Sequence, residues 1–345
     1  MTTARDDGRE RGALLAWYRA QKRDLPWRRD RDPYRIWISE VMLQQTTVAA
    51  VIPYYLRFLA RFPALGDLAA APLEDVLAHW AGLGYYSRAR NLHASAQALV
   101  RRPDGFPRTY QELIEMPGFG PYTARAVASL AFGQPVGVLD GNVIRTLTRR
   151  YGLALEWWRP AERTRLQDLA DRLAAPPALD GDDAYDWNQG MMELGATVCT
   201  PTRPACLLCP WSAGCVARTE GRIGELPLKR ARRSREIWAW HPTVHERGGR
   251  VAIVPNDYAP FLKGHWIWPG RVERLEAAPK SFDYRATVTH RDVFVALDPK
   301  PVDADSLGPE AKWISRQDLS KWVPASLALK AIEAADRRAG KTNEV

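Results

Sequence analysis

All four cysteines of the chain lie in one short segment, and this feature constrains the fold more than any other. They are Cys199, Cys206, Cys209 and Cys215, separated by six, two and five residues. Four thiolates from one loop can surround a cubane cluster, and the prolines between them keep this segment out of helix. Disulfides are disfavoured without a secretory signal, and zinc sites usually have two close cysteine pairs. The spacing therefore predicts a 4Fe-4S cluster in the loop 199–215.

Composition and charge limit the rest of the molecule. With 345 residues, 46% of them hydrophobic, the chain can bury cores for two domains. Its first twelve residues lack the apolar run of a secretory signal, and no later stretch is apolar enough to span a bilayer. We therefore expect a cytoplasmic monomer with no membrane partner. The net charge of +9 favours a polyanionic partner, although basic proteins without one are common.

The pattern of apolar residues divides the chain. They recur at helical spacing from Ala13 to about Ala196, which predicts a mainly helical region over residues 1–222. A linker is expected at 223–236, where the basic residues are Lys229, Arg230, Arg232, Arg233 and Arg235. These charges could be solvated or could contact phosphate. Strands at Arg250–Pro255 and Asp292–Asp298, and a helix at Leu319–Arg338, predict a smaller α+β domain over 237–345.

A second motif lies in the run from Leu113 to Ala124. A helix end, the sequence Pro-Gly-Phe-Gly and a new helix predict a helix-hairpin-helix over about 111–127. Gly118 and Gly120 lack side chains, so the amides there could approach a DNA phosphate, although an ordinary helix–helix turn would look the same. Together with the cysteine spacing, the motif resembles the helix-hairpin-helix DNA glycosylases that carry an iron–sulfur cluster.

One position separates two chemistries in that superfamily. Members that also cut the DNA backbone have a lysine on the second helix of the hairpin, where its amine forms a Schiff base. Here the corresponding residue is Tyr122, and Lys22 is the only lysine before Lys229. The sequence therefore favours a glycosylase that uses water.

The candidate general acid is Glu40, in the segment Ile36–Thr46. Wound as a helix, this segment is apolar nearly all round, with a polar stripe of Glu40, Gln44 and Thr47. Apolar neighbours favour the protonated carboxyl, as an acid requires, although a helical glutamate is more commonly solvated. The segment resembles the catalytic helix of the adenine DNA glycosylases, the MutY family.

The candidate second carboxylate is Asp140, in Leu139-Asp140-Gly141-Asn142-Val143. An aspartate before an apolar-periodic run is a natural helix N-cap. In the family that the chain resembles, the same element supplies the essential aspartate. The two interpretations are compatible, because a carboxylate fixed at a helix start is well oriented for chemistry.

The resemblance covers Leu14 to Cys215 densely and implies a mechanism on double-stranded DNA with adenine mispairs. Adenine opposite 8-oxoguanine or guanine is flipped out, Glu40 protonates its N7, and Asp140 stabilises or traps the oxocarbenium-like sugar. Tyr122 and Asn142 would support the intermediate and position water. Gln44, Gln45 and Tyr85 would contact DNA, the last two as wedges in the base stack. By itself Tyr85 could equally be a core or surface aromatic.

The last domain resembles the Nudix-like domain with which the same family reads 8-oxoguanine. It lacks the Glu-rich metal-binding helix of Nudix hydrolases, so pyrophosphate hydrolysis is not expected. In place of the family's Phe-Ser-His loop it has Val288-Thr289-His290, and we expect Thr289 and His290 to contact the lesion. Two rival interpretations remain: a glycosylase for thymine opposite guanine, which predicts a different residue at position 40, and a catalytically silent iron–sulfur DNA-binding module.

Overall fold

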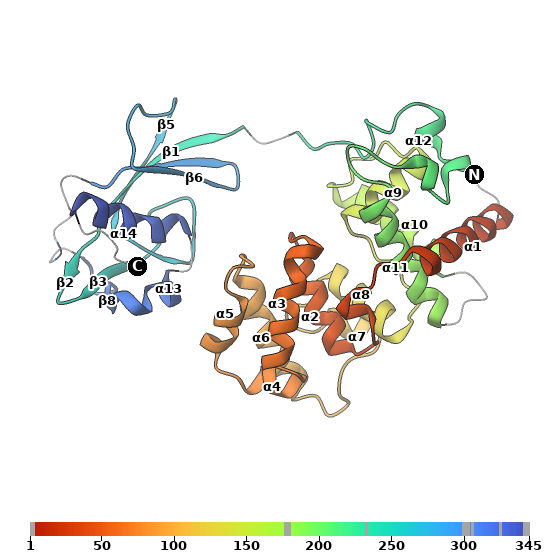
Figure 1. The fold of residues 1–345 in the computed structure, drawn as a ribbon, viewed down its shortest axis with the longest axis horizontal. Helices are drawn as coiled ribbons and strands as arrows, with labels where there is room; N and C mark the ends of the chain where they lie inside the picture. The colour runs from red at the N-terminus through yellow and green to blue at the C-terminus, as the bar shows by residue number, and fades with distance from the viewer. Residues whose placement is uncertain are drawn as a thin grey trace. The chain divides into compact units, whose positions relative to one another are not determined.

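The chain forms two compact units in the computed structural model, Met1–Arg230 and Ala231–Val345, here called unit 1 and unit 2 (Figure 1). The structure describes residues 4–175, 181–231, 234–298, 304, 307–323 and 326–340. The division falls inside the predicted linker 223–236, of which Arg232 and Arg233 lie outside the described residues.

Unit 1 is helical over the region for which the sequence predicts helix. Its helices are α1 Ala4–Gln21, α2 Pro33–Leu43, α3 Val48–Arg61, α4 Leu65–Ala70, α5 Leu73–Trp80, α6 Ser87–Leu99, α7 Tyr110–Ile114, α8 Pro121–Phe132, α9 Gly141–Tyr151, α10 Pro160–Ala174, α11 Gly181–Thr197 and α12 Val216–Thr219. Short 3-10 helices occur at Pro26–Arg28, Cys206–Leu208 and Ser212–Gly214. The pair α7 and α8 forms the predicted helix-hairpin-helix.

Local sequence explains where the helices that carry the candidate site begin and end. Asp32 starts α2, because its carboxylate accepts the Tyr34 amide at 2.8 Å and Pro33 occupies the first helical position. Helix α8 begins with Pro121 and ends at Gly133, whose φ of 68° is the left-handed conformation that closes helices.

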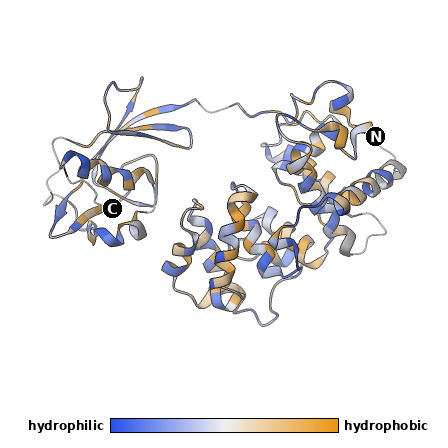
Figure 2. Ribbon diagram, in the orientation of Figure 1, coloured by the Kyte–Doolittle hydropathy of each residue, from blue (hydrophilic) through white to orange (hydrophobic). Residues whose placement is uncertain are grey.

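Two hydrophobic clusters hold unit 1 together, and hydrophobic residues run along α3 and its neighbours (Figure 2). The first cluster joins α2, α3, α5, α6 and α8, and includes Trp37 stacked on Phe119 with ring centroids 5.2 Å apart. The second joins α1, α9, α10 and α11, and it also includes Trp211 of the cysteine loop. Met192 on α11 packs against both clusters, so it marks the place where they meet.

Unit 2 is an α+β structure with two small sheets. Its elements are β1 Glu236–Pro242, β2 Glu246–Arg247, β3 Arg250–Pro255, β4 Trp266–Ile267, β5 Gly270–Leu275, β6 Tyr284–Val288, β7 Arg291–Val295, β8 Lys312–Ser315, α13 Leu319–Trp322 and α14 Ser326–Arg338. The first sheet has the order β5-β1-β7-β6, with β1 and β7 parallel and its other pairs antiparallel. In the second, β3 pairs with β2, β4 and β8.

The structure corrects two predicted elements of unit 2. The strand predicted at Asp292–Asp298 is Arg291–Val295, and at Leu297 the amide donates to the Asp283 carboxylate instead of to a strand. The helix predicted at Leu319–Arg338 is two helices, α13 and α14. Val323, which ends α13 with φ −119° and ψ 73°, precedes a proline, and this position disfavours helix. Residues 324 and 325 lie outside the described residues.

Within the described part of the chain, no helix is long and apolar enough to cross a membrane.

Helix α11 packs closely against the start of α9, and the contact leaves no room for a side chain at Gly195. A Cβ on Gly195 would lie 2.9 Å from both Cα and the carbonyl oxygen of Asn142. We expect Gly195→Ala to lower the free energy of unfolding by about 1–3 kcal/mol. In Gly66→Ala, on α4, the added methyl group meets open space, so stability should hold or rise. Chemical denaturation checks both, and equal effects of the two would contradict the close packing.

Candidate active site

A cavity of about 640 Å³ in unit 1 brings together the residues that the sequence nominated for catalysis. Its lining includes Glu40 on α2, Tyr122 on α8, and Asp140 and Asn142 at the start of α9. Glu40 and Asp140 therefore reach one cavity from helices that belong to the two different hydrophobic clusters.

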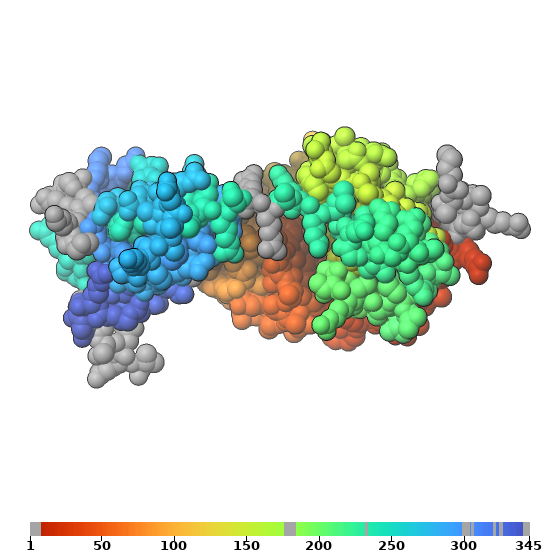
Figure 3. Space-filling view, turned by 90° about the horizontal axis from the view of Figure 1, so that it is seen from above, coloured from red at the N-terminus to blue at the C-terminus, as the bar shows by residue number. Residues whose placement is uncertain are grey.

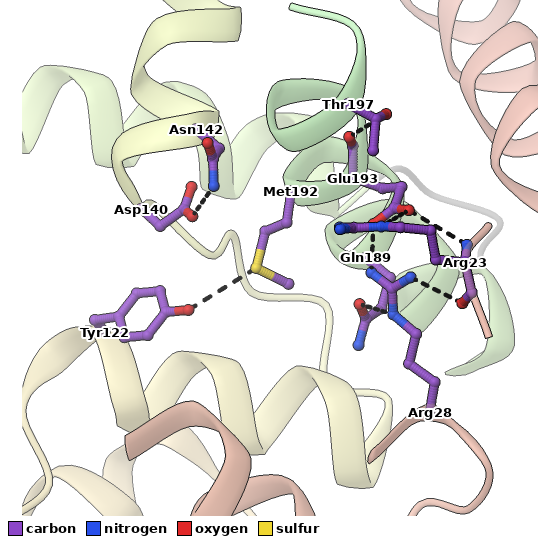
Figure 4. Close-up of polar contacts among 9 residues, drawn as sticks. All are labelled: Arg23, Arg28, Tyr122, Asp140, Asn142, Gln189, Met192, Glu193 and Thr197. Atoms are coloured by element: carbon purple, nitrogen blue, oxygen red, sulfur yellow. Dashed lines mark hydrogen bonds and ion pairs between the residues drawn. The ribbon is translucent and has the colours of Figure 1, made fainter. Parts of the chain in front are cut away.

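Glu40 is buried, with 4% of its surface exposed, and its hydrogen-bond partner is a neutral group. The Tyr122 hydroxyl donates a hydrogen bond to Glu40 Oε2 at 2.6 Å, and it also approaches the Met192 sulfur at 3.9 Å (Figure 4 shows Tyr122 and Met192). Burial raises the pKa of Glu40 to about 7, against the lowering effect of the Tyr122 hydrogen bond, and the Asp140 charge raises it further. This carboxyl group can therefore hold a proton near neutral pH and donate it.

The predicted polar stripe of Glu40, Gln44 and Thr47 on one helix is wrong. Helix α2 ends at Leu43, and Thr47 begins the next helix, where its hydroxyl accepts the Ala50 amide at 3.4 Å. A threonine that can cap a following helix competes with continuation of the preceding one. Glu40 and Gln44 still line the cavity, and Gln44 donates to the Thr123 hydroxyl at 3.3 Å.

Asp140 serves as the N-cap of α9 while lining the cavity. Its Oδ1 accepts the Val143 amide at 2.7 Å. Its Oδ2 accepts the Asn142 side-chain amide at 2.9 Å, the contact drawn in Figure 4. Asn142 is itself held by Arg145, whose Nη2 donates to the side-chain oxygen Oδ1 of Asn142 at 2.8 Å. Burial raises the pKa of Asp140, and the Val143 and Asn142 hydrogen bonds oppose that effect. The hydrogen bond from the Val143 amide thus fixes the direction of Oδ1, and the Asp140 carboxylate is rigidly oriented.

A polar group on the cavity wall was missed by sequence reasoning. Glu193 on α11 accepts bidentate hydrogen bonds from Arg23 at 2.6 and 2.7 Å and one from Arg28 at 2.8 Å, and Arg28 also donates to Gln189 at 3.0 Å (Figure 4). Although burial opposes it, the hydrogen bonds from the two arginines lower the pKa of Glu193. Gln189 and Glu193 are four residues apart, on one face of α11, and this spacing was the available signal.

The residues nominated as wedges lie on two loops, and the loop after α2 lines the cavity. Gln45 follows α2, is exposed and contributes to the lining, whereas Tyr85 precedes α6, is 60% exposed and is outside the lining set. Both have the left-handed backbone that favours glycine, with φ of 59° at Gln45 and 50° at Tyr85. Their predicted contact with DNA stays a prediction.

The hairpin between α7 and α8 uses its two glycines differently. Gly118 has φ 79°, and a Cβ there would collide with the Ser95 hydroxyl, so backbone and space both require glycine. Gly120 is the N-cap of α8 and would place a Cβ in open space. The N-terminal amides of α8 are therefore not covered by a side chain at this position, as the phosphate prediction needs.

The four cysteines line one small cavity of about 30 Å³ with Arg149. Among the described residues, no three His, Cys, Asp or Glu side chains are placed to hold a single metal ion. Burial raises the pKa of Cys209 to about 11 and also raises that of Cys215, so their thiolates need positive charge nearby. Arg149 Nη1 lies 3.5 Å from the Cys199 sulfur. Four sulfurs around one cavity, with a cation beside them, fit a 4Fe-4S cluster.

The cysteine loop also reaches the surface of unit 1. Leu207 and Leu208, between the close cysteine pair, are 87% and 69% exposed. Figure 3 shows the segment near residues 200–220, in green, on the face in view.

Thr289 and His290 lie in unit 2, at the turn between β6 and β7. Thr289 has φ 57°, and its hydroxyl lies 3.3 Å from His290 Nδ1. His290 Nε2 is 3.7 Å from the Glu236 carboxylate, at the start of β1. Arg235 of the basic run binds both oxygens of Asp292 at 3.0 Å, so this cation already has a partner. The proposed contact of Thr289 and His290 with a lesion stays a prediction.

Several known proteins are similar to this chain. Residues 38–170 match the model of the HhH-GPD superfamily base excision DNA repair protein. The adenine DNA glycosylase of Homo sapiens is 50% identical over 218 residues, covering 60% of this chain and 39% of that protein. The corresponding protein of Arabidopsis thaliana is 36% identical over 307 residues, covering 77% and 48%. Residues 38–170 thus carry the domain of the HhH-GPD superfamily, and the chain is similar to the adenine DNA glycosylases.

A solved structure agrees with the family in fold. A thermostable thymine-DNA glycosylase aligns with a TM-score of 0.56 and 29% identity, covering 63% of this chain and all of that one. The chain spans about two fifths to one half of the length of the two curated MutY relatives named above.

The raised pKa of Glu40 predicts how stability depends on pH. A carboxyl group whose pKa is about 7 when folded and 4.5 when unfolded binds more protons in the folded state, so it destabilises the fold as pH rises between these values. Glu40→Gln removes this cost. The free energy of unfolding of the variant minus that of the native chain should therefore increase by about 1–3 kcal/mol when the pH is raised from 4.5 to 8. Urea denaturation at both pH values checks this. A constant difference would mean that Glu40 titrates normally.

Proposed function

We propose that the protein is a monofunctional DNA glycosylase that excises adenine opposite 8-oxoguanine or guanine from double-stranded DNA in base excision repair. One observation carries the proposal: a buried, protonatable Glu40, bonded to Tyr122, lines the same cavity as the oriented carboxylate of Asp140. The names of the related adenine DNA glycosylases support the choice of base.

The reaction begins with extrusion of the base, because its glycosidic bond is out of reach inside the stack. A cavity of about 640 Å³ is large enough for the flipped nucleoside. Arg28, Gln189 and Glu193 supply part of its polar wall. Gln44, Gln45 and Tyr85 contact the DNA, and the glycines of the hairpin admit a phosphate.

Glu40 then acts as the general acid. Its proton goes to adenine N7, so that the C1′–N9 bond breaks with its electron pair on N9 and the base leaves uncharged. The Tyr122 hydrogen bond orients the carboxyl group and stabilises the carboxylate that proton transfer leaves behind. A group with a pKa of about 7 is suited to this task near neutral pH.

Asp140 faces the positive charge that develops on the sugar. Its carboxylate stabilises the oxocarbenium-like centre or bonds to C1′, and water then completes hydrolysis. The Val143 and Asn142 hydrogen bonds hold it in one orientation, which lowers the cost of reorganisation during the reaction. Tyr122 stands where bifunctional enzymes have lysine, so no Schiff base forms and the strand is left intact.

The remaining parts have supporting roles. Cys199, Cys206, Cys209 and Cys215 would hold a 4Fe-4S cluster, which joins the loop into one rigid element on the protein surface. Unit 2 is Nudix-like and reads 8-oxoguanine through Thr289 and His290. The protein acts as a cytoplasmic monomer.

A second candidate is removal of thymine opposite guanine, favoured by the likeness in fold to a thymine-DNA glycosylase. The buried acid argues against it, because Glu40 is set up to protonate a ring nitrogen and N7 of adenine offers one. A duplex with thymine opposite guanine therefore serves as the competing substrate in the assay.

Single-turnover assays test the proposed chemistry. On duplex DNA with adenine opposite 8-oxoguanine, we expect free adenine and an abasic strand that breaks only after alkali, with little borohydride-trapped adduct. Glu40→Gln and Asp140→Asn should each slow release by about a hundred- to ten thousandfold while binding survives. Thymine release, efficient trapping, or near-native rates in either variant would contradict the assignment.

The cofactor proposal has a readout independent of activity. Purified protein should be yellow-brown and contain about four irons per chain, as four thiolates at this spacing favour. Cys206→Ser should weaken folding of the loop and DNA binding. Colourless protein with one tightly bound zinc would remove the cluster from the proposal.

The lesion-reading role of unit 2 is tested by one double variant. Replacing both Thr289 and His290 with alanine should reduce the preference for adenine opposite 8-oxoguanine over adenine opposite guanine by roughly ten- to a hundredfold, the effect of losing polar contacts to a base edge. Equal effects on the two substrates would mean that this loop does not sense the lesion.

A further inference from the structure

Arg88, near the start of α6, connects two loops that are distant in the sequence. One is the α2–α3 loop, residues 44–47, and the other is the α5–α6 loop, residues 81–86. The Arg88 guanidinium donates only to backbone carbonyls: Nη1 to Val41 at 2.8 Å, Met42 at 3.0 Å and Gln44 at 2.7 Å, and Nη2 to Leu83 and Gly84 at 3.3 Å each. One side chain therefore fixes the path of both loops.

The residues that follow these carbonyls have unusual backbone conformations. Gln45, directly after Gln44, and Tyr85, directly after Gly84, are two of the four non-glycine residues with positive φ in the described structure. Each such conformation costs about 1–2 kcal/mol. Both side chains are exposed, so packing of the side chain in a core does not compensate this cost. The hydrogen bonds that Arg88 donates to the carbonyls of the preceding residues, Gln44 and Gly84, compensate this cost.

Aromatic contacts extend the connection. The guanidinium carbon lies 5.5 Å from the centroid of the Tyr85 ring and 5.3 Å from that of Trp80, which is fully buried. Val41 and Met42 are in the last turn of α2, where carbonyls lack helical partners and a cation is favoured. The same charge thus caps α2 and stacks against Tyr85.

We propose that Arg88 is a positioning residue that holds Gln45 and Tyr85 as a rigid pair, ready to enter the base stack. This rests on the proposed function, in which opening the stack precedes excision. Separating stacked bases costs a few kcal/mol, and side chains that must first be ordered would add their own entropy to that cost. The planar fork of arginine can bind both loops at once, whereas a lysine ammonium is a single point.

The test compares two substrates that differ only in the need for a wedge. In the first, adenine is paired opposite 8-oxoguanine in a duplex. In the second, adenine lies in an unpaired bubble, where no stack has to be opened. Arg88→Met should slow single-turnover release from the duplex by about a hundredfold, the scale of a misplacement of about 1 Å, and change release from the bubble by less than about threefold.

Two further variants separate positioning from charge. Arg90→Met, two residues along α6, removes the same charge from a side chain that has no hydrogen bond or ion pair with another described residue, and it should retain the native rate on both substrates. Arg88→Lys keeps the charge without the fork and should lose most of the duplex rate. Equal losses on duplex and bubble, no loss on the duplex, or full activity of Arg88→Lys would each overturn the proposal.

A binding measurement keeps this inference distinct from the proposed chemistry. In a Glu40→Gln background, a duplex with 2-aminopurine as the target base should become more fluorescent on binding, as the base leaves the stack. Adding Arg88→Met should abolish most of that rise. If the protein releases no adenine but the rise still depends on Arg88, the proposed function fails and the positioning role stands. An undiminished rise overturns the positioning role alone.

Discussion

The chemistry of the cavity depends on a carboxyl group that is kept away from water. Glu40 lies in α2, whose buried apolar residues belong to the larger hydrophobic cluster of unit 1, and its hydrogen-bond partner is the neutral hydroxyl of Tyr122. Burial in these surroundings is the main reason that its pKa reaches about 7. The Tyr122 hydrogen bond opposes this rise, and Tyr122 lies on α8, which follows the turn that requires glycine at position 118.

Asp140 illustrates how a structural role and a chemical role can reinforce each other. As an N-cap it stabilises the start of α9, and the same hydrogen bond fixes the direction in which its carboxylate points. Gly195 allows α11 to pack closely against Asn142, the second group that binds this carboxylate. The geometry around Asp140 is therefore maintained by the helix cap together with an Asn142 side chain at a position where two helices pack closely.

Features that depend on residues close together in the sequence could be predicted from local patterns. The cysteine spacing, the cap at Asp140 and the glycines of the hairpin are motifs of this kind. The polar stripe failed because Thr47 starts a new helix, a competition that helical periodicity alone does not reveal. The group of Arg28, Gln189 and Glu193 was missed because its members become neighbours only when the start of the chain packs against α11.

The scarcity of lysine in unit 1 has a consequence for the product of the proposed reaction. Its lysines are Lys22 and Lys229, and arginines provide the rest of its positive side chains apart from histidine. An abasic site carries a reactive aldehyde in its open form, which condenses with primary amines but not with guanidinium groups that stay protonated. Under the proposed function, arginines of unit 1 that contact phosphates around an abasic site would not cross-link to it.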